Sequence, residues 1–78
     1  MSLPSISGRK LIKALAKIGF KLVSIKGSHA KLKKNGKTTI IPLHREIAKG
    51  TLLSILRQAG ISKQELLKLL KDPQHQET

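Results

Sequence analysis

The 78-residue sequence contains no cysteine, which excludes disulfide bridges, thiolate nucleophiles and thiolate-ligated metal sites. Aromatic side chains are almost absent as well, since Phe20 is the only one. Many proteins that bind single-stranded nucleic acid stack its bases on a platform of Phe or Tyr side chains, and this mode of binding is therefore excluded. A chain of this length predicts one domain over residues 1–78, with an open surface rather than a deep active site.

Long apolar runs are missing too. No stretch approaches the roughly 20 apolar residues that span a bilayer, and residues 1–7 lack the charged start and apolar core of a secretory signal. These absences predict a cytoplasmic protein with no membrane partner.

Acidic residues are scarce: 16 Lys and Arg stand against 4 Asp and Glu, which gives a net charge of +12. The excess is uneven, because residues 1–45 hold eleven bases and no acid, whereas residues 46–78 hold five bases and all four acids. A positive electrostatic field that is concentrated in the first half of the chain predicts a polyanionic partner that contacts that half.

The hydrophobic pattern predicts an α+β fold. Ser7 can cap a helix that ends at Gly19, and a β-prone run then follows up to a turn at Lys26-Gly27. A second strand covers residues 29–33, Asn35-Gly36 marks a tight turn, and a third strand covers residues 38–41 and is closed by Pro42.

Helices resume after this meander. Thr51 opens a helix that Gly60 stops, and Ser62 with Glu65 forms a capping box for a last helix. The order αβββα, with its last helical part split, predicts helices on one face of a three-stranded antiparallel sheet. The core should span about residues 7–71, and the tail 72–78, which includes His75, should fray.

On the predicted second strand, alternation places Ala30 and Leu32 toward the helices and His29, Lys31 and Lys33 on the opposite face. Nearby cations disfavour the imidazolium and attract phosphate. A neutral imidazole can take the proton of a ribose 2′-hydroxyl, and an ammonium group can stabilise the charge that develops on phosphorus. His29 is thus a candidate catalytic residue for RNA cleavage that needs neither metal nor cofactor, although an exposed His near Lys is also an ordinary surface feature.

Two segments resemble the signature of the HicA toxin family. They are Gly27-Ser28-His29 and the stretch from His44 through Lys49-Gly50-Thr51-Leu52 to Gly60. The resemblance extends over about residues 7–70. Unlike the usual family pattern, Ala30 and Lys31 follow the Gly-Ser-His segment.

Membership of this family implies a fold similar to the double-stranded RNA-binding domain, mRNA cleavage without the ribosome, His29 as catalytic residue, and a HicB-like antitoxin as partner. Contacts with RNA are expected from the Gly-Ser segment and the basic hairpin, namely Lys26, Ser28, Lys31, Lys33, Lys34 and Lys37.

Several other residues have more than one interpretation. Gly27 can approach a phosphate or simply serve a turn, and Ser28 can bond a phosphate or its own turn. His44 is a second acid, a phosphate contact or a residue that fixes its loop. Arg57, with Gln58, can contact RNA or antitoxin, or can belong to a solvated helix face.

Three other functions compete with the nuclease. A non-catalytic double-stranded RNA-binding module would share the fold and differ only in failing to cleave RNA. A helix-turn-helix DNA-binding domain over residues 51–71 would leave the basic first half of the chain without contacts to the phosphates. A purely structural interaction protein would leave the charge unexplained.

Overall fold

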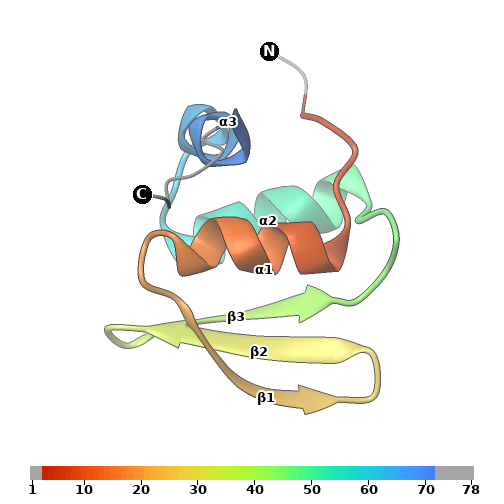
Figure 1. Cartoon of the computed structure of the whole chain (residues 1–78), viewed down its shortest axis with the longest axis vertical. Helices are drawn as coiled ribbons and strands as arrows, with labels where there is room; N and C mark the ends of the chain where they lie inside the picture. Colours follow the sequence, from red (N-terminus) through yellow and green to blue (C-terminus); the bar gives the residue numbers. More distant parts are fainter. Residues whose placement is uncertain (1–2, 72–78) are drawn as a thin grey trace.

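The computed structural model describes residues 3–71, so the predicted tail 72–78 and His75 lie outside the described residues. Within that part, the elements in chain order are α1 (Gly8–Ala16), β1 (Lys21–Lys26), β2 (His29–Lys34), β3 (Lys37–Pro42), α2 (Lys49–Ala59) and α3 (Lys63–Lys71). The strands form one antiparallel sheet in the order β1-β2-β3 (Figure 1). The prediction of an α+β fold with a split last helix is confirmed.

The molecule has a sheet layer and a helical layer. Helices α1 and α2 lie side by side over one face of the sheet, and α3 lies beyond them, on the side away from the sheet (Figure 1). Both α1 and α2 pack against β3, and α3 packs against α1. The opposite face of the sheet, called the open face below, is left without a helix over it.

Helix α1 forms as its sequence predicts. Ser7 is extended (φ −83°, ψ 159°), and its hydroxyl accepts a hydrogen bond of 3.1 Å from the backbone N–H of Lys10. Leu11 and Leu15 are fully buried on the inner side of the helix. Gly19, with φ +103°, lets the chain leave the helix toward β1.

Two tight turns set the register of the sheet. Lys26 pairs with His29, so the first loop consists of Gly27 and Ser28, and the predicted turn at Lys26-Gly27 was placed one residue too early. The reason is the positive φ of Gly27 (+57°), which suits the first position of a two-residue loop and lets Lys26 remain in the ladder. At the second turn, Asn35-Gly36 is confirmed, with φ values of 47° and 83°.

Strand β1 contains a β-bulge at Val23. On one side of it Ser24 pairs with Lys31, and on the other Leu22 pairs with Leu32. Strict alternation from Ser24 would have placed Leu22 on the open face. The extra residue shifts the period, so Leu22 shares the helix side with Leu32.

Helix α2 begins at Lys49, two residues before the predicted Thr51, and its N-cap Ala48 makes no side-chain bond. The residue before this N-cap is anchored by a tertiary contact: the backbone N–H of Ile47 donates to the carbonyl of Ile6 (2.9 Å), and the Ile47 side chain is buried. The anchored residue lies two positions before the first residue of α2. The predicted end at Gly60 (φ +75°) is confirmed.

The start of α3 is also as predicted. The N–H of Ser62 donates to a carboxylate oxygen of Glu65 (2.9 Å), and the N–H of Glu65 donates back to the Ser62 hydroxyl (3.1 Å). This is the expected capping box.

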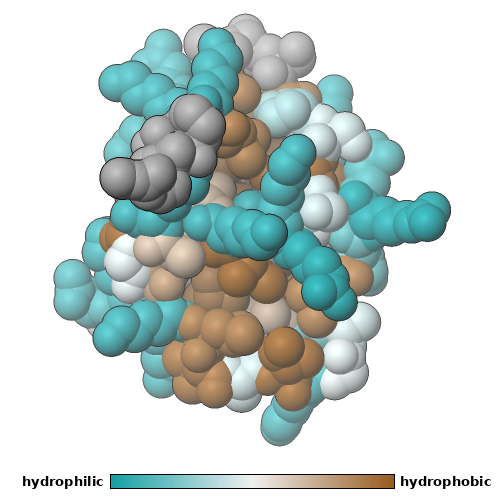
Figure 2. All heavy atoms as spheres, in the orientation of Figure 1, coloured by the Kyte–Doolittle hydropathy of each residue, from teal (hydrophilic) through white to brown (hydrophobic). Residues whose placement is uncertain are grey.

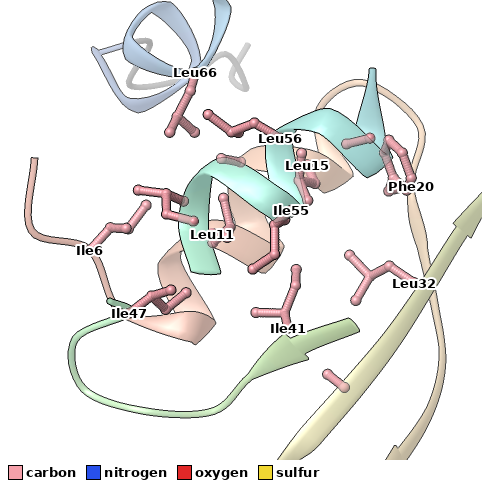
Figure 3. Close-up of a cluster of buried hydrophobic side chains, with 14 residues drawn as sticks. Ile6, Leu11, Leu15, Phe20, Leu32, Ile41, Ile47, Ile55, Leu56 and Leu66 are labelled. Carbon is pink, nitrogen blue, oxygen red and sulfur yellow. The ribbon is translucent and has the colours of Figure 1, made fainter. Parts of the chain in front are cut away.

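The hydrophobic core fills the space between the sheet and helices α1 and α2 and continues between these helices and α3 (Figure 3). Its fully buried members come from all layers and include Leu11, Leu15, Leu32, Ile41, Leu52, Ile55 and Leu66. Thr39 is buried among them, and its hydroxyl lies 2.7 Å from the side-chain oxygen of Gln58, to which it donates. That bond satisfies the buried hydroxyl and joins β3 to α2.

Leu32 gives a direct test of this packing. Leu32→Ala should lower the free energy of unfolding by about 2–5 kcal/mol, because it removes buried methyl groups from the middle of the sheet. Ile40→Ala, on the open face and 41% exposed, should change it by less than about 1 kcal/mol. Urea titration of both variants measures the difference. Equal losses would mean that the two sides of the sheet are not packed as described.

Candidate functional site

The open face is built from alternate residues of the three strands. The register gives its members as Lys21, Ser24 and Lys26 on β1, His29, Lys31 and Lys33 on β2, and Thr38 and Ile40 on β3. All of these side chains are exposed. Four lysines therefore share a single surface with one histidine.

His29 stands at the end of β2 and has two lysines as near neighbours on the open face. Lys26 is its direct partner on β1, and Lys31 is two residues along the same strand, on the same face. In such a ladder, direct partners have Cβ atoms about 5 Å apart and residues two positions apart are about 7 Å apart. Pro42 pairs with His29 from the β3 side. An anion that contacts the imidazole is thus within reach of at least two ammonium groups.

Among the described residues, no acidic residue belongs to the open face. Within residues 3–71 the acids are Glu46, in the loop before α2, and Glu65, in the first turn of α3. Glu65 is engaged in its capping box. The open face therefore carries cations only.

Lys34 and Lys37 do not lie on the open face. They pair with each other at the β2–β3 turn, on the helix side of the sheet. The Lys34 ammonium is 5.9 Å from the centre of the Phe20 ring, and the aliphatic part of the Lys34 side chain lies beside Gly19. The Lys37 ammonium would lie 2.8 Å from a Cβ placed on Gly60.

Each of these two lysines sits next to the C-terminal end of a helix, α1 in one case and α2 in the other. A helix C-terminus carries partial negative charge, which attracts cations. The structure therefore separates Lys34 and Lys37 from His29 and places them beside the ends of two helices.

Ser28 and His44 flank the His29 end of the sheet. The carbonyl of Ser28 accepts a hydrogen bond from the N–H of Leu43 (2.7 Å), and the carbonyl of His44 accepts one from the N–H of Gly8 (3.0 Å). The backbone of this loop thus connects the β1–β2 turn to the start of α1. The His44 side chain itself is exposed.

Arg57 is exposed on α2, in the helical layer, and the structure does not bring it together with His29. Gln58, its neighbour, is held by Thr39. This pair of residues therefore belongs to a different surface from the open face.

Lys21 and Ser24 belong to the open face, although the sequence reasoning did not select them as site residues. Lys21 reaches it only because the bulge at Val23 shifts the alternation, so that it pairs with Lys33. Two adjacent apolar residues, Leu22 and Val23, followed by the alternation of Ser24 and Ile25, are the signal that could have indicated a bulge.

The described residues contain no group of three or more His, Cys, Asp and Glu side chains placed to hold a metal ion. Nor is any helix among them long and apolar enough to cross a membrane.

Comparison with known protein families matches residues 8–61 to the HicA toxin of bacterial toxin–antitoxin systems. The match runs from the first residue of α1 to just past α2, so it includes the whole sheet and leaves α3 outside. A search of curated proteins gave no match to this chain.

Gly8 holds the loop beside His29 in place, and it offers a test against Gly50. A Cβ on Gly8 would collide with the carbonyl of Pro42, whereas a Cβ on Gly50 would meet nothing within 4 Å. Gly8→Ala should therefore cost about 1–3 kcal/mol of stability through overpacking. Gly50→Ala, inside α2, should stabilise the protein by roughly 0.5–1 kcal/mol. Thermal melting of both variants measures this, and a neutral Gly8→Ala would contradict the close approach of α1 to β3.

Proposed function

Since this chain belongs to the HicA toxin family of bacterial toxin–antitoxin systems, we propose that it is a metal-independent endoribonuclease that cleaves mRNA on its open face. The observation that carries this proposal is the position of His29, which is exposed and directly opposite Lys26, with Lys31 two residues along the same strand and no acidic residue in any of the three strands. These are the groups that RNA transesterification uses.

The chemistry follows from the 2′-hydroxyl of the substrate. His29 accepts the proton of this hydroxyl while its oxygen forms a bond to the adjacent phosphorus, and the bond from phosphorus to the 5′-oxygen breaks. The imidazolium so formed supplies the proton with which the 5′-oxygen leaves. Lys26 and Lys31 stabilise the extra negative charge on the phosphoryl oxygens. The products are a 2′,3′-cyclic phosphate and a 5′-hydroxyl.

Substrate binding is electrostatic in this proposal. The single aromatic side chain, Phe20, is buried, so no base can stack on it. Contacts then fall mainly on phosphates, which makes the preference for RNA sequence loose and the affinity dependent on salt.

The same face provides the means of control. A toxin–antitoxin family implies an antitoxin partner, and we propose a HicB-like protein that places an acidic surface on the open face and covers His29. A toxin of this kind acts in the cytoplasm, where mRNA is found.

A non-catalytic RNA-binding module is the second candidate, favoured by the basic open face itself. It would bind RNA through the same lysines and leave it intact. Cleavage in the presence of a chelator distinguishes the two functions.

The two pairs of lysines on β2 and β3 give the first test. Lys31→Gln with Lys33→Gln, on the open face, should weaken binding of a short labelled RNA and reduce the slope of log affinity against log salt by about 2. Lys34→Gln with Lys37→Gln removes the same charge from the helix side and should leave the slope nearly unchanged. Fluorescence anisotropy across a salt series measures both. Equal effects of the two double variants would contradict the open face as the RNA surface.

His29 gives the second test, with His44 as its matched control because both side chains are exposed. His29→Ala should keep its melting temperature and RNA affinity and lose cleavage by about two to four orders of magnitude. His44→Ala should cleave at a rate close to that of the unchanged protein. The rates are measured with EDTA present, and the product ends are analysed for the cyclic phosphate.

Full cleavage by folded His29→Ala would refute the assignment of His29. If the unchanged protein binds RNA but does not cleave it, the non-catalytic binding module is the correct function.

A further inference from the structure

A shallow apolar groove of about 320 Å³ runs between α1 and the edge strand β1, on the helix side of the sheet. Its floor and walls are aliphatic, and its rim is basic: the lining residues are Arg9, Ile12, Lys13, Leu22, Ile25 and Leu43. Figure 2 shows the apolar surface low on this face, beneath α1 and over β1, with hydrophilic side chains around it. The groove is separate from the open face, which lies on the other side of the sheet.

The groove exists because the helices do not cover β1. They pack on β3, so the helix side of β1 extends beyond them. Leu22 is 49% exposed and Ile25 is 53% exposed, although both point to the same side of the sheet as the buried residues Ala30 and Leu32. Such aliphatic side chains at the border of a core are available to a partner.

We propose that this groove is the anchoring site for the antitoxin, which inserts aliphatic side chains of an acidic segment between α1 and β1. The aliphatic side chains would fill the space between Ile12, Leu22, Ile25 and Leu43, and the acidic groups would meet Arg9 and Lys13 on the rim. The inference deepens the proposed function, because it rests on the antitoxin partner that the family implies, and it does not depend on RNA cleavage.

The lining of the groove favours an acidic protein segment over two other occupants, RNA and a second copy of this chain. RNA would match the basic rim, but it gains little from an aliphatic floor that has no aromatic side chain to stack on its bases. A second copy of this chain would match the apolar floor, but each copy carries a net charge of +12, and the two rims would repel each other. An acidic segment with aliphatic side chains satisfies both features.

The bulge at Val23 argues that the partner binds by side chains in the groove. A regular edge strand could accept an added strand through its free N–H and carbonyl groups, but a bulge interrupts that row. Lys21 and Lys26, at the two ends of β1, further disfavour simple strand addition. The groove beside the strand, where Leu22 and Ile25 lie, is left as the anchoring surface.

The test compares two leucines that are similarly exposed. Leu22→Ser changes the groove, and Leu53→Ser changes an exposed leucine of α2 outside it. Isothermal titration calorimetry with a purified HicB-like antitoxin should show a loss of affinity of at least about tenfold for Leu22→Ser and little change for Leu53→Ser. Lys13→Glu, on the exposed rim of α1, should also weaken binding. RNA affinity should be unchanged in all three variants.

Circular dichroism tests whether each variant is folded. If Leu22→Ser is unfolded, the antitoxin affinity of Lys13→Glu decides the outcome. Unchanged antitoxin affinity in the groove variants would overturn the proposal. So would an equal loss with Leu53→Ser, a parallel loss of RNA affinity, or a dimer of the unchanged protein that Leu22→Ser converts to a monomer. Because calorimetry with the antitoxin uses no RNA, a toxin that fails to cleave RNA would not affect these results.

Discussion

The register of the central strand β2 is the constraint on which the rest of the molecule depends. Ala30 and Leu32 are fully buried, while His29, Lys31 and Lys33 alternate with them on the other side. A shift of one residue would bring a histidine and lysines into the core, which would cost far more than a small domain can offset. The Gly27-Ser28 and Asn35-Gly36 turns at the two ends hold β2 in place, so packing and the candidate site are specified together.

The same register places the lysines of the hairpins on two different sides of the sheet. Lys31 and Lys33 extend from the open face, where no helix or carboxylate meets them, while Lys34 and Lys37 turn back to the ends of α1 and α2. The two groups are alike in the sequence, and only their position relative to the register separates them. Of these four lysines, only Lys31 and Lys33 therefore share a surface with His29.

Patterns that depend on neighbouring residues were predictable from the sequence. The cap at Ser7, the Asn35-Gly36 turn, the capping box of α3 and the alternation of β2 all follow from local rules. What local rules missed depends on contacts between distant residues. Helix α2 starts early because Ile47 is tied to Ile6, and Lys21 joins the open face because of a bulge against β2. The position of His29 needed only alternation, whereas the positions of Lys34 and Lys37 needed the helices.

The bulge also gives the edge strand two chemically different sides. One side contributes Lys21, Ser24 and Lys26 to the open face, and the other contributes the aliphatic wall of the groove. A regular β1 would have exchanged Leu22 and Lys21, which would have placed an aliphatic side chain among the lysines and a cation at the border of the core. Because β1 is an edge strand with no helix over it, a partner that reaches past it touches both sides. An antitoxin anchored in the groove is thus one strand away from His29, and it can cover that histidine without any rearrangement of the sheet.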